Sequence, residues 1–445
     1  MKRGAEPPER GRIKKVPRDR IPSRRHIPTG PDAAGARCTA LPLERQKRLQ
    51  RRSRFCVAFD CPGASLELPD VAGTTQEALY AGLDLELSWS EEDLPQVKRT
   101  KHVHSLHPYL GKFIPQLVEV FLQRYFAPGS CVYDPFAGSG TTLVESNAFG
   151  ADSIGADISA FNCLLTRVKT AQYSLGELEL RLRGALEETR RHLPDSHGGA
   201  SPWLEEWFNP RALSELLAYR TAISELPEPY TSVGRVILSR AARSARQTTH
   251  FDLDFPRKPT TGPYQCFKHK RTCRPVEEAM KFLTRYTADT IRRIREFADI
   301  RTPRAVTVMH ADSRAVALPA RPHGVITSPP YPGLIDYHEQ HRYAYELLSL
   351  VDRREEEIGA AASGRTRVAI DDYIASMSAV FENTRRQLRP NAPVLIVVND
   401  SKALYPRILE NAGLELEDRI TRHVNRRTGR RAGEFFEDVL ICRPS

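Results

Sequence analysis

The sequence predicts an α/β fold with a mostly parallel sheet, crossover helices and a large, mainly helical insertion. Three observations support this prediction. Short apolar segments typical of buried strands alternate with helical periods from about residue 98 onward. A strand, a glycine-rich turn and a helix follow one another directly between residues 130 and 149. A helix-rich stretch over roughly 165–302 separates the second and third expected strands, and it is too long for a simple crossover.

The first three elements form a βαβ unit. A strand is expected over 130–136, a helix over 141–149 and a second strand over 152–158, because two apolar segments flank a glycine turn and a helical period. The same reasoning predicts a smaller insertion over about 333–371. Further strands are expected over 305–311, 323–327, 393–398, 414–424 and 435–442, and helices of the large insertion over 175–192, 210–224 and 276–297.

The net charge of +11 is distributed unevenly along the 445 residues. Residues 1–54 carry 17 Lys/Arg and 5 Asp/Glu, and their many prolines and missing apolar period predict a disordered basic tail. Such a tail suits either a polyanion such as nucleic acid or a solubilising role. Residues 55–97 contain nine acidic and no Lys or Arg side chains, which predicts an acidic linker segment. The remainder is expected to divide into a catalytic domain, 98–170 and 303–445, and an inserted helical subdomain, 171–302.

Composition excludes several classes of protein. No apolar run approaches the roughly 20 residues of a membrane span. No apolar stretch follows the basic start, as it would in a signal peptide. The eight cysteines are scattered without a disulfide framework, which predicts a reducing compartment and therefore a cytoplasmic location.

The sharpest motif is Asp-Pro-Phe-Ala-Gly-Ser-Gly-Thr-Thr at 134–142, which leaves a strand and opens a helix. Glycines at such a turn let the backbone approach a ligand, and the first N–H groups of the helix remain free to bind it. The motif lacks the lysine of a phosphate-binding P-loop, and Leu143 stands where a dinucleotide fingerprint has its third glycine. The candidate cofactor-binding residues are Asp134, Phe136, Gly138, Ser139, Gly140, Thr141 and Thr142.

Two further strand ends carry acidic residues. Asp157 and Ile158 follow the glycine turn by about 20 residues, the offset at which a carboxylate accepts hydrogen bonds from ribose hydroxyls. The alternative is that Asp157 or Ser159 simply caps the next helix. Asp312 and Ser313 end the third strand and are expected to face the same crevice, with a turn-forming Asp as the alternative.

The fourth strand ends in Ser328-Pro329-Pro330-Tyr331. Two prolines remove backbone donors and leave carbonyls free to accept, while serine adds a hydroxyl and tyrosine a ring for stacking. These groups suit the binding of a planar exocyclic amine. The same letters occur in polyproline segments, but their position after a buried strand favours the catalytic interpretation.

Together, these motifs resemble those of the S-adenosylmethionine-dependent, amino-methylating DNA methyltransferases. Residues 134–142 are similar to the family's cofactor motif, and 327–331 are similar to its catalytic motif in the serine form associated with cytosine N4 methylation. Residues 107–115 are similar to the segment that closes over the methionine end of the cofactor, which implicates Lys112 and Phe113. The resemblance implies a Rossmann-like sheet, S-adenosylmethionine as cofactor, duplex DNA with a flipped target base, and a restriction-modification role beside a companion nuclease.

Several alternatives stay open from the sequence. Adenine N6 methylation is chemically close, and tRNA guanine N2 methyltransferases share a similar glycine motif, although they generally carry Asn before Pro-Pro-Tyr. A nucleic-acid-binding protein with an inactive cofactor fold is a third interpretation. Cytosine C5 methylation is rejected, because it needs a cysteine nucleophile beside the catalytic proline and Tyr331 stands there.

Basic clusters over 235–275 and 419–431 are the expected contacts with DNA, and a solvated loop face is the alternative. Six residues separate Cys266 from Cys273, and no second cysteine pair is present, so no metal is expected. His338 and His341 are expected to have structural or substrate-contacting roles. The candidate DNA-binding residues are Arg240, Arg243, Arg246, Lys268, Lys270, Arg271, Arg426 and Arg427.

Overall fold

The computed structural model describes most of the chain beyond residue 86, all of it within the compact unit Thr74–Ser445. The predicted basic tail, 1–54, and most of the acidic segment, 55–97, lie outside the described residues. The described ranges are 87–89, 94–111, 113–193, 200–250, 256–364, 366–424 and 435–445.

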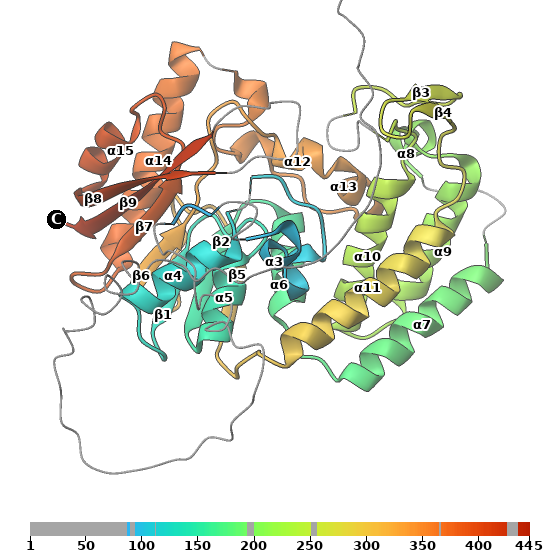
Figure 1. The fold of residues 1–445 in the computed structure, drawn as a ribbon, viewed down its shortest axis with the longest axis horizontal. Helices are drawn as coiled ribbons and strands as arrows, with labels where there is room; N and C mark the ends of the chain where they lie inside the picture. The colour runs from blue at the N-terminus through green and yellow to red at the C-terminus, as the bar shows by residue number, and fades with distance from the viewer. Residues whose placement is uncertain are drawn as a thin grey trace, which may run out of the picture. The chain divides into compact units, whose positions relative to one another are not determined.

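Seven strands form one sheet in the order β5-β2-β1-β6-β7-β9-β8 (Figure 1). The first five of these are mutually parallel, and β9 is antiparallel to both β7 and β8. This topology confirms the predicted α/β class. The strands are β1 Cys131–Asp134, β2 Asp152–Asp157, β5 Val306–His310, β6 Gly324–Thr327, β7 Val394–Val398, β8 Leu414–His423 and β9 Phe436–Pro444.

Helices cover both faces of the sheet, and the side-chain alternation of β7 shows how. Leu395 and Val397 point into an apolar cluster with helix α4, whereas Val394, Ile396 and Val398 point into a cluster with α14 and α15. A strand buried on both faces is a continuous apolar run, and such a run makes β7 recognisable in the sequence. The covering helices are α4 Pro115–Tyr125, α5 Thr141–Phe149, α6 Ala160–Thr170, α14 Arg367–Gln387 and α15 Tyr405–Ala412.

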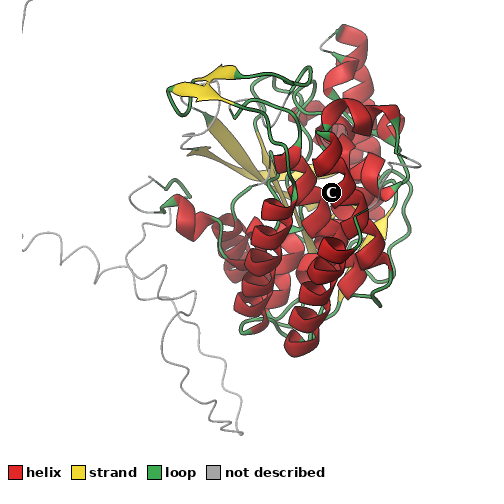
Figure 2. Ribbon diagram, turned by 90° about the vertical axis from the view of Figure 1, so that its right-hand side faces the viewer, coloured by secondary structure: helices red, strands yellow, loops and turns green. Residues whose placement is uncertain are grey.

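The large insertion is a set of helices that packs beside α5 and α6. Val144 of α5 and Phe161 of α6 share one apolar cluster with Leu213, Val236 and Ile291 of the insertion, so a continuous core joins the two regions. A short two-stranded hairpin, β3–β4, stands apart from the main sheet (Figure 2). The elements are α7 Leu175–Arg191, α8 Pro202–Trp207, α9 Pro210–Ser224, α10 Tyr230–Ala245, β3 Tyr264–Cys266, β4 Arg271–Cys273 and α11 Met280–Ala298.

Short elements complete the described chain. Four lie between β6 and α14, within the smaller insertion that the sequence predicts, and two precede α4. Among the described helices, none has the length and apolar character that a bilayer crossing requires. The short elements are α3 Gln96–Arg99, η1 His102–Ser105, α12 Tyr337–Gln340, α13 Arg342–Leu348, η2 Arg354–Glu356 and η3 Ala361–Ser363.

Part of the basic segment that the sequence assigns to DNA contact lies in helix α10. The sequence predicts a DNA-contacting surface over the basic segment that begins at Arg235, but the first part of this segment is a helix whose Val236, Ile237 and Leu238 are buried in the core. The arginines alternate with apolar residues at helical spacing, and that spacing is the signal that charge alone does not reveal.

Candidate active site

A cleft of about 810 Å³, including space open to solvent, lies at the carboxyl edge of the parallel strands. The loops after β1, β2, β5 and β6 all contribute to it, as the general rule for open α/β sheets predicts. The strand ends that the sequence singled out therefore meet in one cleft.

The glycine loop after β1 forms the floor of the cleft and turns tightly into α5. Gly140 has φ +78°, and a Cβ there would lie 2.7 Å from the side chain of Thr166, so only glycine fits. Thr166 donates to the Gly138 carbonyl at 3.2 Å, and the buried Lys169 donates to the Ser139 carbonyl at 2.5 Å. Helix α6 thus holds the loop from below, a role that sequence reasoning missed.

Asp157 ends β2 at the centre of the cleft. Its carboxylate accepts hydrogen bonds from the backbone N–H of Gly138 at 2.7 Å and of Ser159 at 2.8 Å, and from Asn162 Nδ2 at 3.1 Å. Burial raises the pKa of Asp157, although these hydrogen bonds partly oppose the shift. The carboxylate keeps acceptor capacity toward the cleft, which suits ribose hydroxyls. The helix-capping alternative is also realised in part, because the Ser159 side chain caps α6.

The loop after β5 brings a second carboxylate and a hydroxyl to the same edge. Ser313 Oγ donates to the Pro135 carbonyl at 2.6 Å and so ties this loop to the glycine loop. Asp312 lines the cleft, but both of its oxygens also bind Arg314. The ion pair with Arg314 outweighs partial burial and lowers the pKa of Asp312.

Asp134 lies beneath the loop and connects two strand ends. Its Oδ1 accepts from the Phe136 N–H at 3.0 Å and from Thr327 Oγ1 at 2.6 Å. Thr327 is the residue immediately before Ser328, so one carboxylate oxygen joins the glycine loop to the predicted catalytic loop. Burial raises the pKa of Asp134 to about 6.

The loop after β6 is only partly as expected. Ser328 and Pro330 line the cleft, but the Pro330 carbonyl already accepts a hydrogen bond from the Tyr373 hydroxyl at 2.9 Å. Tyr331 does not line this cleft. Its ring packs on the cluster around α14, and its hydroxyl donates to Glu437 of β9 at 3.3 Å.

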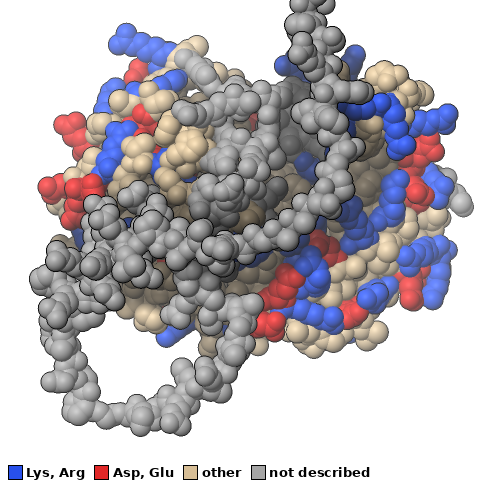
Figure 3. Space-filling model, viewed as in Figure 1, with Lys and Arg blue, Asp and Glu red and all other residues tan. Residues whose placement is uncertain are grey.

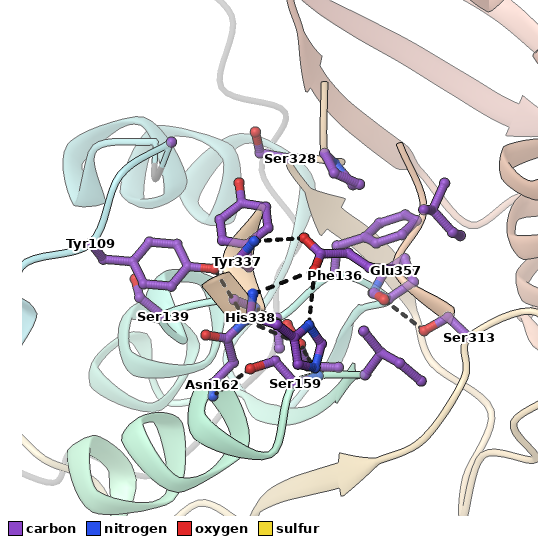
Figure 4. Close-up of a pocket in the computed structure, with 18 of the residues that line it drawn as sticks. Tyr109, Phe136, Ser139, Ser159, Asn162, Ser313, Ser328, Tyr337, His338 and Glu357 are labelled. Atoms are coloured by element: carbon purple, nitrogen blue, oxygen red, sulfur yellow. Dashed lines mark hydrogen bonds and ion pairs between the residues drawn. The ribbon is translucent and has the colours of Figure 1, made fainter. Parts of the chain in front are cut away.

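A wall of residues that the sequence did not assign to the cofactor closes the cleft (Figure 4). The rings of Tyr109 and Tyr337 stack with centroids 5.5 Å apart. Glu357 accepts from the Tyr337 backbone N–H at 2.7 Å and lies 2.8 Å from Nδ1 of His338. His338 thus contacts Glu357, and His341 Nδ1 lies 2.9 Å from the Tyr337 carbonyl, while the structural or substrate-contacting role expected of the two histidines stays a prediction. Glu357 carries no signal in the sequence, because its partners lie about 20 residues away.

Most of the predicted cofactor residues meet in this cleft. Asp134, Gly140 and Thr142 are buried beneath the loop, and Lys112 lies outside the described residues. Among the predicted catalytic residues, Pro329 does not line the cleft. The predicted cofactor residues that line it are Phe113, Phe136, Gly138, Ser139, Thr141, Asp157, Ile158, Asp312 and Ser313.

The cleft fits S-adenosylmethionine in the chemistry of its donors. The carboxylate of Asp157 suits the ribose, the glycine loop allows close approach of the backbone, and aromatic faces suit a sulfonium cation. The buried Oδ1 of Asn162, beside Asp157, has no protein partner among the described residues. An unpartnered acceptor at this point leaves a place for a ligand donor.

Two of the predicted DNA contacts at α10 make contacts within the protein. Arg240 pairs with Asp289 at 2.7 Å and covers the Tyr286 ring at 4.1 Å, and Arg246 is buried against the Tyr343 ring. Arg243 is half-buried on the same helix. These arginines therefore stabilise the packing of the insertion.

The remaining basic candidates divide into two groups. Lys268, Lys270 and Arg271 are exposed on the β3–β4 hairpin, whereas Arg426 and Arg427 lie outside the described residues. Elsewhere on the insertion, basic and acidic side chains alternate on the surface (Figure 3), many as pairs along α7. Such a mixed surface is a poor match to a polyanion, so the hairpin remains the described candidate.

Two cysteines and two histidines meet at the hairpin, against the expectation that no metal site exists there. Cys266 Sγ lies 3.5 Å from Nδ1 of His250 and 3.6 Å from Nδ1 of His269, and Cys273 Sγ lies 3.5 Å from the same atom of His269. The spacing of the two cysteines does not predict this cluster, because the other two side chains in it are histidines.

A second group of titratable residues, near α5, is structural. His102, His104 and Glu145 are buried close together. Lys101 forms an ion pair with Glu119 and a second one, at 2.9 Å, with Glu145. The ammonium group therefore occupies the position of a cation, and no metal is needed there.

The sheet order and the cleft at its carboxyl edge define the class: an S-adenosylmethionine-dependent methyltransferase. Residues 62–167 match the N6/N4 methyltransferase family model, described as DNA methylase. The type II methyltransferase M.MjaII of Methanocaldococcus jannaschii is 37% identical over 448 residues, which covers 82% of this chain and 84% of that protein. The chain therefore belongs to the amino-methylating N6/N4 family of DNA methyltransferases.

More distant similarities are local or slight. The type II methyltransferase M.MvaI of Kocuria varians is 39% identical over 70 residues, 15% of each chain. Among solved structures, TrmN from Thermus thermophilus matches with a TM-score of 0.30 and 11% identity over 76% of this chain and 50% of that one. A structural similarity this low has no bearing on function.

Proposed function

We propose that this enzyme methylates the exocyclic N4 of cytosine in duplex DNA, as the methyltransferase of a restriction-modification system. The observation that carries this proposal is the shared cleft of Ser328, Gly138 and Asp157, which puts a candidate amine-binding hydroxyl beside the cofactor residues. Within the described part of the chain, the Ser328 hydroxyl makes no hydrogen bond to another residue, so it is available to a substrate.

The chemical problem is the weak nucleophilicity of an exocyclic amine, whose lone pair is delocalised into the ring. The bound cofactor supplies an electrophilic methyl group on its sulfonium. Ser328 Oγ would accept one N–H of the amine and thereby favour its more tetrahedral form, while positioning supplies much of the remaining acceleration. No covalent intermediate with the protein is required.

A prolyl carbonyl would accept the second N–H of the amine. The Pro330 carbonyl already accepts a hydrogen bond from the Tyr373 hydroxyl, so we assign this role to the Pro329 carbonyl. Pro329 follows Ser328 in the chain but, like Tyr331, lies outside the lining of the cofactor cleft. The Tyr373 bond also stabilises the loop, because Tyr373 belongs to α14 and is buried in the core. The loop is thereby fixed before the substrate arrives.

Tyr331 is assigned the stacking of the flipped base. Extracting a base from the duplex costs a few kcal/mol and needs a surface that replaces its stacking neighbours. The hydrogen bond between Tyr331 and Glu437 orients the tyrosine ring. The Tyr331 ring lies outside the cofactor cleft, as a base-stacking surface should.

Adenine N6 methylation remains the second candidate, because it uses the same acceptors on a similar amine. The serine at position 328 supports cytosine through the resemblance of the motif. Recognition of the DNA sequence is assigned to the inserted helices, 171–302, with the exposed cations of the β3–β4 hairpin as phosphate contacts.

The test identifies the modified nucleoside. The full chain would be incubated with isotopically labelled S-adenosylmethionine and either duplex DNA or tRNA, and the nucleosides would be separated by mass spectrometry. We expect label in N4-methyldeoxycytidine from DNA, and labelling about 10²-fold slower or more with Ser328→Ala protein at the same enzyme concentration. Label in N6-methyldeoxyadenosine would overturn the base assignment, and labelled guanosine from tRNA would overturn the DNA substrate.

A further inference from the structure

We propose that His250, Cys266, His269 and Cys273 bind one zinc ion tetrahedrally and that this structural site holds the β3–β4 hairpin. The four ligand atoms all lie within 4.8 Å of one another, so they surround a single point. The site lies in the insertion, and none of its residues lines the cofactor cleft. It is therefore a separate feature from the methyl-transfer chemistry.

The distances agree with a tetrahedron around zinc. Zinc bonds of about 2.3 Å to sulfur and 2.05 Å to nitrogen, at tetrahedral angles, separate a sulfur and a nitrogen ligand by about 3.6 Å. The measured sulfur–nitrogen separations are 3.5, 3.6 and 3.5 Å. The rings of His250 and His269 meet edge to face with centroids 4.6 Å apart, which lets both direct a nitrogen at one point.

The chemical types of the four ligands indicate which metal they bind. Two thiolates and two imidazoles in tetrahedral geometry favour zinc, whereas hard cations prefer oxygen ligands. Both thiols would lose a proton to solvent on binding, and both histidines would bind in the neutral form.

The hairpin also needs a source of stability. Its strands have three residues each, and between 264 and 273 only the two cysteines are buried. The Phe267 side chain at the turn is 75% exposed. An isolated two-stranded hairpin is marginally stable in water, and a structural metal is the usual substitute for a missing core in small elements.

A hydrogen-bond network without metal is the competing account. Tyr264 Oη lies 2.8 Å from Nδ1 of His250 and 3.0 Å from the His250 backbone nitrogen. With zinc bound through Nδ1, the tyrosine would keep only its contact with the backbone N–H. The two accounts differ in metal content, which can be measured directly.

The site gives the exposed cations a defined position. Lys268 and Lys270 flank the ligand His269, and Arg271 begins β4. Zinc would therefore hold three positive side chains on a rigid turn. This consequence for DNA rests on the proposed function, whereas the zinc site does not.

The test measures metal in the full chain purified without a chelating tag. Elemental analysis should find about one zinc per chain in the wild type and at least tenfold less in Cys266→Ser and Cys273→Ser. Cys131→Ser, which changes a half-buried cysteine of β1, and His192→Ala, which changes an exposed histidine, should keep the wild-type content. Zinc content unchanged in both site variants, or no zinc in the wild type, would overturn the proposal.

Two further measurements distinguish loss of the zinc site from misfolding of the variants and check the metal geometry. S-adenosylmethionine binding by calorimetry should persist in Cys266→Ser, because the cofactor cleft is separate. Cobalt(II) substituted into the wild type should give the intense visible bands of a tetrahedral site and a thiolate charge-transfer band. The weak spectrum of octahedral cobalt would contradict the assigned geometry, and wild-type protein that carries iron in place of zinc would contradict the assigned metal.

Discussion

The environment of Asp134 differs from the one that its sequence motif predicts. The motif predicts a contact with the cofactor, yet Asp134 is buried beneath the loop and accepts from Phe136 and Thr327 through one oxygen. Asp134, the first residue of the motif, therefore connects the glycine loop to the loop after β6. A carboxylate held in this way is sensitive to pH.

A pH prediction follows from the pKa of Asp134, raised by burial to about 6 from an ordinary value near 3.8. A raised pKa stabilises the folded protein at low pH, and this stabilisation is lost as the pH rises through about 6. Asp134→Asn can retain both acceptor contacts at Oδ1 without the charge. Its unfolding free energy relative to wild type should therefore increase between pH 4 and 7, by on the order of 3 kcal/mol for about two pKa units.

Denaturant unfolding at pH 4, 5, 6 and 7 checks this result. Asp418→Asn, on the exposed side of β8, serves as the control and should show no comparable trend. A stability difference between Asp134→Asn and wild type that stays constant over this range would contradict the assigned environment.

Ser328 gives the second prediction at this scale. Ser328→Ala removes the proposed acceptor of the amine proton and should lower kcat about 10²-fold or more, as removal of one transition-state hydrogen bond does elsewhere. The dissociation constant for S-adenosylmethionine should change little, because the glycine loop and Asp157 are untouched. Single-turnover kinetics and calorimetry separate the two effects, and wild-type turnover in this variant would refute the catalytic assignment.

At the level of single residues, the sequence locates what lies near a strand end and misses what depends on distant partners. Asp157 and Ser313 are predictable because each lies at or within a few residues of the end of a strand. Glu357 and His250 are not, because their partners are brought together only by tertiary folding. Tyr331 is half-buried beside Glu437, a contact across 106 residues that no local pattern indicates.

Among the elements, the basic segment 235–275 is split between helix α10 and the β3–β4 hairpin. Arg240 and Arg246 pack on the rings of Tyr286 and Tyr343, whereas the hairpin cations face solvent. Charge counting cannot distinguish these cases, because it ignores the apolar residues between the charges. The helical period over 230–245 does separate them.

The hairpin prediction concerns electrostatics. Replacing Lys268, Lys270 and Arg271 with alanine should weaken DNA binding and reduce the slope of log K against log salt by about 0.9 for each phosphate that these side chains neutralise. The control replaces Arg181, Arg183 and Arg191 of α7, which removes the same charge from a surface where each arginine already pairs with glutamate. Equal slopes for the two triple variants would exclude the hairpin as a phosphate-binding element.

For the whole molecule, strand order and the position of the cleft follow from a few local signals. The glycine turn after β1 and the acidic end of β2 fix the first βαβ unit, and the apolar run of β7 identifies a central strand. The packing of the large insertion does not follow, because its apolar residues join those of α5 and α6 in one cluster. Boundaries drawn from composition cannot reveal such a shared core.

The basic tail supports a prediction about the complete chain. Deleting residues 1–54 removes a net charge of +12 and should weaken non-specific DNA binding and its salt dependence. Methyl transfer at saturating DNA should remain close to wild type, because the described cleft contains no residue of the tail. Filter binding at several salt concentrations and a turnover assay check the two parts, and failure of the shortened chain to bind S-adenosylmethionine would show that the tail is needed for folding.

The single oxygen of Asp134 that joins the two loops has a thermodynamic consequence. Asp134 connects the glycine loop, which faces the cofactor, to the loop after β6, which is assigned to the target base. We therefore expect the binding free energies of cofactor and DNA to be coupled, and such coupling is reciprocal. The factor by which S-adenosylhomocysteine tightens DNA binding should equal the factor by which DNA tightens S-adenosylhomocysteine binding. Thr327→Val, which removes the shared donor, should reduce both factors equally, and factors unchanged by this substitution would show that the coupling takes another route. In the intact enzyme, binding of the cofactor would then change the affinity for DNA, and the reverse, through one buried carboxylate oxygen of Asp134.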